Sequence, residues 1–501
     1  MRLAPASHAA LVNPVAGVST LDEVLTHNAQ RDPDGLALVD ARLPFEGTWR
    51  ETDRAVSALA AAFAGWRLKP DAVVGVQLGS SFESALVCLA LWRAGLTAAL
   101  LPLAWRRREI TAALAAVGAE AVVVRTQAAG GRPAESVCEA AVDLERLRFI
   151  GVFGADEPDG ATPLDEVLEQ HAGRFARADR PMDAADHVAV ITFDAGAVPV
   201  PRSHNELVAL GLAPVLAARL TGADRLFSTL DFAGLPGLAC GFTPWIVTRC
   251  AAAFHQPSST EAFAEAARRL QATLLVAPGA ALPRLVKDGA LKGVTLTAAI
   301  AAWRAPDPRS SAAQPAAAAP LFVDAIAFGE LGLVATERPG HGRPAPLALG
   351  AIAPEGLDAL IETRVAEDGR LGVRGPACPS AAFPVETGSA LAFGAEGWLD
   401  TGLVGLADHA AGRLALGGRR GVLQAGGLSV LKAEAQRALA AVGLTGALDA
   451  QSDADLGSRL RLTLHAPSER ATDVAARLET EGFGPAFTPT IAAPEASRGA
   501  A

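Results

Sequence analysis

The sequence predicts an α/β protein built from two or three domains. Its 501 residues exceed what one hydrophobic core usually organises. Hydrophobic residues make up 50% of the chain and charged residues 20%, as is typical of globular proteins. From residue 48 onward, short apolar runs alternate with segments of helical periodicity. That alternation is typical of a parallel sheet covered by helices on both faces.

The first alternating region spans residues 48–124. Helical periodicity is found at residues 48–64, 82–93 and 107–117, and buried-strand patterns at residues 72–78, 98–101 and 121–124. A stretch of Gly, Pro and polar residues at 127–136 interrupts the pattern. We therefore expect one parallel sheet from this region.

A second alternating region begins with a buried-strand pattern at residues 187–193. Residues 194–201 (DAGAVPVP) form a Gly/Pro loop, and the polar residues Ser203, His204 and Asn205 then open a helix. Strand, tight loop and helix is the order in which α/β proteins present backbone N–H groups to phosphates. The loop holds a single glycine and no lysine. It is therefore either a weakened phosphate loop or a plain turn between strand and helix.

The rest of the chain changes character after a connector. Strand-like patterns recur at residues 225–229 and 272–277, and helical patterns at residues 235–245 and 261–270. Residues 305–320 are of low complexity and read as an exposed connector. Short strands at residues 371–374 and 413–416 lie in Gly-rich surroundings, which indicates a β-rich subdomain. Gly417 and Gly418 are the best hinge candidates before a small α+β tail.

Composition excludes several classes of protein. The net charge of −10 and basic runs of at most three arginines disfavour nucleic acid as a partner. Five scattered cysteines form no CxxC pair, which indicates buried, reduced thiols rather than a zinc site or a disulfide framework. The sequence contains no convincing membrane span or signal peptide. We expect a cytoplasmic protein, and the sequence does not indicate a protein partner.

Seven short motifs follow one another along the chain. They are TWRE at residues 48–51, WRAGLTAALLPL at 92–103, RSHN at 202–205, FGELG at 328–332, GVRGP at 372–376, WLDTG at 398–402, and GRR at 418–420 with Gly426, Gly427 and Glu434. In this order they resemble the adenylate-forming superfamily of acyl-CoA synthetases, peptide-synthetase adenylation domains and luciferases. The resemblance spans roughly residues 20–465.

This resemblance implies an architecture and a reaction. Residues 1–416 would form a large AMP-binding region of two α/β subdomains plus a distorted β-barrel. Residues 417–490 would form a small, mobile α+β C-terminal domain, truncated relative to the family, and residues 491–501 a disordered tail. Such enzymes join ATP and a carboxylic acid into an acyl-adenylate with Mg²⁺, and most then pass the acyl group to a thiol such as coenzyme A (CoA).

The resemblance also assigns site residues. Glu330 matches the glutamate that holds Mg²⁺, and Arg419 matches an arginine that contacts the ribose; a solvated Glu and an exposed structural Arg are the alternatives. Gly426 and Gly427 match the loop that approaches the CoA thiol, although a plain turn fits equally well. His204 matches a loop residue rather than a catalytic base. The remaining nucleotide contacts would come from Thr192, Gly196, Ser203, Phe328, Gly329 and Thr401.

The chain departs from the family at four places. The loop at 194–201 is shorter than the family's phosphate loop, and Val198 stands near the position of its lysine. Leu403 stands where the family has an aspartate that binds both ribose hydroxyls, so those hydroxyls would meet an apolar side chain. No lysine follows Lys432, although the family uses a late lysine in adenylate formation.

Two functions remain open from the sequence. The first is an AMP-forming carboxylate-activating ligase of the acyl-CoA synthetase type. The second is a catalytically impaired protein that keeps the fold as an acyl-, CoA- or nucleotide-binding or regulatory protein, which the four departures favour. A peptide-synthetase fragment is disfavoured because no carrier domain follows. Residues 232–245 and 303–306 are expected to line a pocket for a hydrophobic or aromatic acid, although a packed core would have the same composition.

Overall fold

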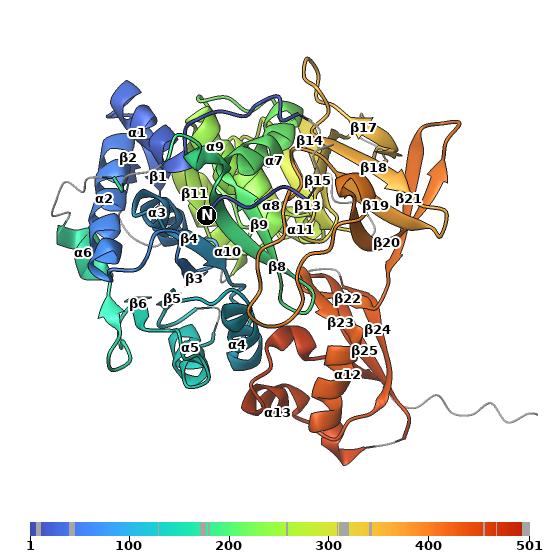
Figure 1. The fold of residues 1–501 in the computed structure, drawn as a ribbon. Coiled ribbons are helices and arrows are strands. Elements are labelled where there is room, and N and C mark those ends of the chain that lie inside the picture. The colour runs from blue at the N-terminus through green and yellow to red at the C-terminus, as the bar shows by residue number, and fades with distance from the viewer. Residues whose placement is uncertain are drawn as a thin grey trace, which may run out of the picture.

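The structure is a computed structural model, and it has a large region and a small C-terminal domain (Figure 1). In Figure 1 the large region runs from blue to light orange, and the small domain is the dark orange and red lobe. The residues described are 1–6, 12–39, 46–128, 130–170, 177–178, 181–256, 259–307, 309, 320–339, 343–453, 456–466 and 468–492. Most of the expected connector at 305–320 lies outside these ranges.

The first sheet has seven strands in the order β7-β6-β5-β3-β4-β8-β9 and is parallel except for the β8–β9 pair. The strands are β3 (Val73–Gln77), β4 (Thr97–Leu100), β5 (Ala121–Arg125), β6 (Phe149–Phe153), β7 (Thr162–Pro163), β8 (Val188–Asp194) and β9 (Val198–Ser203). The accompanying helices are α2 (Trp49–Gly65), α3 (Phe82–Arg93), α4 (Arg107–Ala116), α5 (Pro133–Ala141) and α6 (Asp165–Gln170). The elements expected between residues 48 and 124 are confirmed. All twelve residues of α3 are buried, because neighbouring elements cover it on every side.

The second sheet has eight strands in the order β15-β14-β13-β12-β10-β11-β1-β2. Its strands are β1 (Leu36–Val39), β2 (Glu46–Thr48), β10 (Arg225–Ser228), β11 (Ala251–Phe254), β12 (Leu274–Pro278), β13 (Ala298–Arg304), β14 (Leu321–Ala327) and β15 (Leu333–Glu337). The helices are α1 (Leu21–Arg31), α7 (His204–Ala217), α8 (Leu235–Gly237), α9 (Thr243–Thr248), α10 (Thr260–Leu270) and α11 (Leu282–Lys287). The helix expected at 235–245 is divided, because a π-helical turn at Leu238–Phe242 joins α8 to α9.

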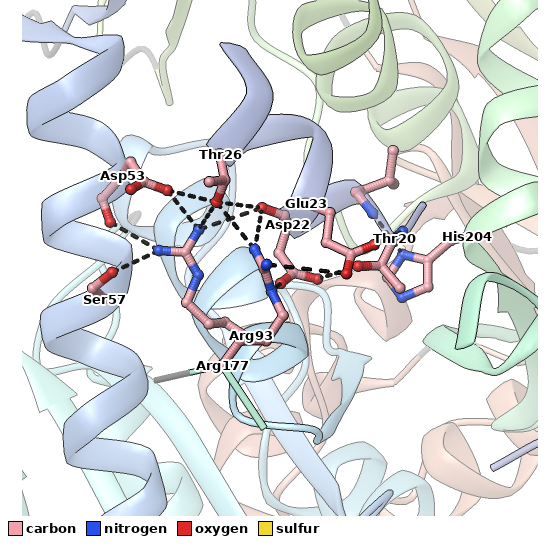
Figure 2. A network of polar contacts seen from close by, with 10 residues as sticks. Thr20, Asp22, Glu23, Thr26, Asp53, Ser57, Arg93, Arg177 and His204 are labelled. Carbon is pink, nitrogen blue, oxygen red and sulfur yellow. Dashed lines mark hydrogen bonds and ion pairs between the residues drawn. The ribbon is translucent and has the colours of Figure 1, made fainter. Parts of the chain in front are cut away.

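A buried polar network anchors the N-terminal helices beside this region. Figure 2 shows two arginines, Arg93 and Arg177, between α1 and α2. Arg93 Nη2 contacts the Asp53 carboxylate at 2.6 Å, and Arg177 Nε contacts the Asp22 carboxylate at 2.8 Å. His204 is the first residue of α7, not a loop residue, and its Nδ1 accepts the backbone N–H of Leu21 at 3.2 Å. These contacts give His204 a structural role.

The third sheet has six strands in the order β16-β21-β20-β19-β18-β17. Its strands are β16 (Leu347–Ala348), β17 (Gly350–Ile352), β18 (Ile361–Val365), β19 (Arg370–Arg374), β20 (Leu399–Asp408) and β21 (Arg413–Arg419). The expected distorted barrel is not observed, because no strand pairing among the described residues closes this sheet. Strand β21 continues through Gly417 and Gly418, so the expected hinge positions lie within a strand.

The small domain has a hydrophobic core of its own. Its elements are β22 (Val422–Ala425), β23 (Leu428–Leu431), α12 (Lys432–Ala441), β24 (Gly446–Asp453), β25 (Gly457–Leu464), α13 (Val474–Thr480) and β26 (Thr490–Ala492). Leu439, Leu460 and Leu478 are buried in that core. The expected disordered tail is wrong at its first two positions, because residues 491 and 492 belong to β26; residues 493–501 lie outside the described part of the chain. The domain boundary given for the small domain stays a prediction.

Candidate active site at the junction of the two domains

The segment expected to be a phosphate loop is a tight β-hairpin. Strand β8 ends at Asp194 and β9 begins at Val198, so only three residues lie between the strands. Gly196 (φ 74°) and Ala197 (φ 56°), two of these three turn residues, adopt the left-handed conformation, which lets the chain reverse within so short a connection. The expectation that a loop leads directly into a helix is therefore wrong, because β9 intervenes. A turn of this length offers few backbone N–H groups to a phosphate.

The helix after the hairpin begins where the sequence indicates. Ser203 is the N-cap of α7, and its Oγ accepts the backbone N–H of Glu206 at 3.2 Å. The Glu206 carboxylate accepts the backbone N–H of Ser203 at 2.8 Å, which completes a capping box. The Ser203 side chain is therefore engaged in capping α7, and its role as a nucleotide contact stays a prediction.

Arg419 is buried at the end of β21 and pairs with Asp194. Its Nη1 donates to Asp194 Oδ1 at 2.8 Å, and its Nη2 contacts Asp194 Oδ2. Arg419 Nε donates to the carbonyl of Thr401 at 2.8 Å, and Nη1 also reaches Ser429 Oγ at 3.2 Å. The pair joins the β8–β9 hairpin, β20 and the small domain. The Arg419 side chain is only 7% exposed, so the exposure in the structural alternative is wrong, while its role as a ribose contact stays a prediction.

Glu330 is also buried, and it pairs with Arg304. Glu330 Oε1 lies 2.8 Å from Arg304 Nη2, and Oε2 accepts the backbone N–H of Leu235 at 2.8 Å. Arg202, fully buried on β9, donates to the carbonyl oxygen of Glu330. The alternative of a solvated Glu at the end of a strand is wrong, since Glu330 is 2% exposed.

The other expected nucleotide contacts are mostly inside the protein. Thr192, Phe328 and Thr401 are buried, and the Thr401 hydroxyl donates to the carbonyl of Leu371 at 2.8 Å. A Cβ on Gly329 would lie 3.2 Å from both Arg419 terminal nitrogens and from Asp194 Oδ2. The loop after β14 therefore lies directly against the Asp194–Arg419 pair. The structure brings Gly329, Glu330 and Arg419 together, as the motif order implies.

A cavity of about 350 Å³ lies beside this cluster, between the large region and the small domain. Its walls are mainly apolar, and the large region contributes Leu103, Ala233, Gly234, Pro236, Trp303 and Arg304. The small domain contributes Gly426, Gly427, Leu428, Leu456 and Gly457. Only part of the expected pocket lining is confirmed, because Phe232, Phe242 and Trp245 are packed in the core.

Gly426 and Gly427 occupy the turn between β22 and β23, with φ values of 57° and 80°. The interpretation of this pair as a plain turn is confirmed, and the turn forms part of the cavity wall. The approach of a CoA thiol to this turn stays a prediction. The position is suited to glycine, since two successive left-handed residues make a tight turn.

Two carboxylates near the cavity were not anticipated from the sequence. Burial raises the pKa of Asp231, although the backbone N–H of Ala233 donates to its carboxylate at 2.9 Å. Burial raises the pKa of Asp307 to about 6, and its carboxylate lies against Gly457 of the small domain. Arg304 is the cation shared by these acids, since it lowers both pKa values in part. The three residues carry no local motif, and their convergence depends on the register of the second sheet.

Comparison with known proteins identifies the family. The model of the AMP-binding enzyme family matches residues 25–341. The chain belongs to this family. A curated relative, the 3-[(3aS,4S,7aS)-7a-methyl-1,5-dioxo-octahydro-1H-inden-4-yl]propanoyl:CoA ligase of Mycobacterium tuberculosis (strain ATCC 25618 / H37Rv), is 26% identical over 84% of this chain and 83% of its own length. The long-chain fatty acid transport protein 1 sequences of Bos taurus and Homo sapiens are 31% and 27% identical, but the matches cover only 22% and 33% of their lengths.

Two solved structures share the fold. The apo structure of Mycobacterium smegmatis MbtA has a TM-score of 0.64 at 21% identity, with 96% of this chain and 92% of that chain covered. The amide bond synthetase McbA from Marinactinospora thermotolerans has a TM-score of 0.73 at 16% identity, with 95% and 96% covered. The adenylate-forming superfamily assignment is thus confirmed, and the relatives named as ligases support a carboxylate-activating ligase.

As arranged here, the site does not fit a magnesium ion at Glu330. Both Glu330 oxygens face N–H donors, and the guanidinium of Arg304 would repel a second cation. In the described part of the chain, no three His, Cys, Asp or Glu side chains are placed to hold a metal ion. The described helices also include none with the length and apolarity needed to cross a membrane.

Proposed function

We propose that this AMP-binding family member is an AMP-forming ligase for a small carboxylic acid. The observation that carries the proposal is the adjacency of distant segments at the domain junction. Gly426 and Gly427 line the interdomain cavity, Arg304 links that cavity to Glu330, and Gly329 lies against Arg419. A substrate carboxylate oxygen would bond to the α-phosphorus of ATP, and pyrophosphate would leave. The thiol of CoA would then attack the acyl carbon, and AMP would leave.

The cavity supports a hydrophobic or aromatic acid as substrate. Trp303 and the neighbouring Leu, Ala and Pro side chains supply apolar walls, and a volume of about 350 Å³ suits a small acyl group. Arg304 is the cation at the Glu330 end of the cavity and is placed to orient a carboxylate. Gly426 and Gly427 leave room for a thiol to approach from the small domain, which supports CoA as the acceptor.

A second candidate is a binding or regulatory protein without catalysis. Internal partners hold both of the charged residues that the family would direct at ATP, Arg419 and Glu330. Leu403, at the position of the ribose-binding aspartate, is completely buried in the core. These observations favour a protein that binds an acyl group or CoA in the cavity and activates nothing.

Mass spectrometry of reaction products tests the two candidates. Purified protein is incubated with ATP, Mg²⁺, CoA and a panel of aliphatic and aromatic acids. The ligase predicts an acyl-CoA that requires both ATP and the acid. Ala302→Phe, which fills the cavity, should abolish the product, whereas Ala411→Phe on an exposed turn should not. The second candidate predicts that CoA or the acid raises the melting temperature of the protein, while no acyl-CoA forms even at a protein concentration equal to that of the substrates.

A further inference from the structure

Arg419 directs four of its five N–H groups at acceptors within the protein. Its Nε donates to the Thr401 carbonyl, and its two terminal nitrogens meet both oxygens of Asp194. Nη1 additionally contacts Ser429 Oγ at 3.2 Å. A carboxylate facing a guanidinium in this bidentate manner is a strong and geometrically selective pairing. The guanidinium is therefore already bound to an anion, and that anion is part of the protein.

The hairpin explains why Asp194 faces Arg419. In the antiparallel register Asp194 opposes Val198, Thr192 opposes Val200 and Val190 opposes Arg202, so these residues share one face of the hairpin. The tight turn fixes Asp194 at the end of that face, and Asp194 Oδ1 also accepts the backbone N–H of Ala195 at 2.8 Å. The Asp194 side chain is 9% exposed, so the pairing takes place away from bulk water.

The same pair lies where the family's nucleotide motif approaches. The Gly329 position is within 3.2 Å of both partners. Leu403 lies directly opposite Arg419 in the β20–β21 register and is buried. An aspartate at position 403 would lie beside Arg419 on the sheet. In this chain the carboxylate beside Arg419 is instead that of Asp194, from the β8–β9 hairpin. Asp400 does not replace it, because Asp400 pairs with Arg370 at 3.0 Å on the surface.

We propose that Asp194 is a selectivity-determining residue, an internal anion that occupies Arg419 and excludes a nucleotide until it is displaced. The inference rests on the proposed function, because it takes Arg419 as the residue that would meet the nucleotide. The nucleotide-competent state is the one in which Asp194 has left Arg419. When few molecules are in that state, the apparent affinity for the nucleotide is reduced in proportion to their fraction. AMP affinity is therefore low in the resting protein, while the acyl cavity stays open.

The pair also couples nucleotide entry to the small domain. Ser429 belongs to β23, and a Cβ on Gly196 would lie 2.6 Å from Leu431 Cδ1 on the same strand. The hairpin therefore contacts β23 directly at Gly196 and indirectly through Arg419, which bonds both Asp194 and Ser429. Displacement of Asp194 from Arg419 breaks the indirect link, so a nucleotide that binds Arg419 also weakens the attachment of the hairpin to β23.

Calorimetric titration of AMP into the full-length protein tests this assignment. Asp194→Asn keeps the shape of the side chain and removes its charge, and Asp194→Ser is a smaller second variant in case the first does not fold. Asp53→Asn is the matched control, since it removes the charge from another arginine-paired carboxylate, in α2 (Figure 2). We expect AMP to bind the Asp194 variants at least about tenfold more tightly than wild type, and Asp53→Asn to bind AMP as wild type does.

The results separate this inference from the proposed function. Folded Asp194 variants with AMP affinity equal to or weaker than wild type would overturn the assignment, as would no AMP binding by any protein in the set. Tighter AMP binding without acid-dependent pyrophosphate release supports the internal anion and argues against the ligase. Acid-dependent pyrophosphate release with unchanged AMP affinity supports the ligase and overturns the internal anion.

Discussion

Arg304 and Glu330 form a buried ion pair, with 2.8 Å between Nη2 and Oε1, at the edge of the interdomain cavity. The Arg304 and Glu330 side chains are 12% and 3% exposed. In the parallel register Arg304 lies opposite Ala327, so the end of β13 stands beside the loop that carries Glu330. The pair therefore links the cavity wall to the one acidic residue of the FGELG motif.

Replacing Arg304 alone should destabilise the protein more than replacing both Arg304 and Glu330. Among the described residues, Arg304→Met leaves the buried Glu330 carboxylate with the Leu235 N–H as its hydrogen-bond partner. We expect a loss of about 3–5 kcal/mol in the free energy of unfolding, as is typical when one member of a buried pair is removed. Urea denaturation of Arg304→Met and of the double variant with Glu330→Met checks this. Equal stability of the single and double variants would contradict it.

Gly196 should be intolerant of a side chain because of Leu431. In Gly196→Ala the new methyl group would meet Leu431 Cδ1 at 2.6 Å, and the left-handed φ of 74° adds backbone strain. We expect a destabilisation of about 1–3 kcal/mol. Adding Leu431→Ala to Gly196→Ala should remove the part of the destabilisation that comes from the steric clash. The part that comes from backbone strain should remain. A double-mutant cycle measured by thermal unfolding would show no coupling if the hairpin and β23 were not in contact.

Glu109 should make the docking of the small domain depend on pH. This α4 residue accepts the backbone N–H of Gly484 at 2.8 Å across the domain junction, close to the ion pair between Arg108 and Glu481. Burial raises the pKa of Glu109 to about 7 despite hydrogen bonds from Gly484 and Arg106, and the charge of Glu434 on α12 adds to the increase.

The direction of the pH effect follows from that raised pKa. The folded protein holds a proton on Glu109 that the unfolded chain, with a value near 4.5, has released. This contribution to stability is complete below pH 4.5 and is lost as the pH rises to 7, by up to roughly 3 kcal/mol. Glu109→Gln cannot titrate, so its unfolding free energy should fall less between pH 5 and 8 than that of wild type. Identical pH slopes for the two proteins would rule out this role.

The sequence predicts the first sheet well and the hairpin poorly, for physical reasons. Continuous apolar runs such as residues 121–124 are joined to their helices by short connections, so the local sequence pattern is enough to predict these strands. Pro199 and Pro201 in contrast indicate a loop, but β9 is the edge strand of its sheet, where proline is tolerated. A local pattern cannot distinguish an edge strand with prolines from a loop.

The site was predictable only where motifs are contiguous. Phe328, Gly329 and Glu330 lie in one short segment, and the structure places them beside Arg419 as the motif order implies. Asp194 and Arg419 are 225 residues apart in the sequence, and their pairing depends on the length of a three-residue turn. Arg304 was expected only as part of the pocket lining at 303–306, and its pairing with Glu330 depends on the register of β13 and β14.

Acid-dependent release of pyrophosphate from ATP is the most direct measurement of carboxylate activation in this cleft. Wild-type protein at a concentration close to that of ATP, with Mg²⁺ and the panel of acids, should release pyrophosphate above the acid-free control for at least one hydrophobic or aromatic acid. Ala302→Phe should return that release to the control level. Calorimetry should first show that the folded protein binds an acid in the cavity. If pyrophosphate release by that protein never exceeds the acid-free control, the account is contradicted.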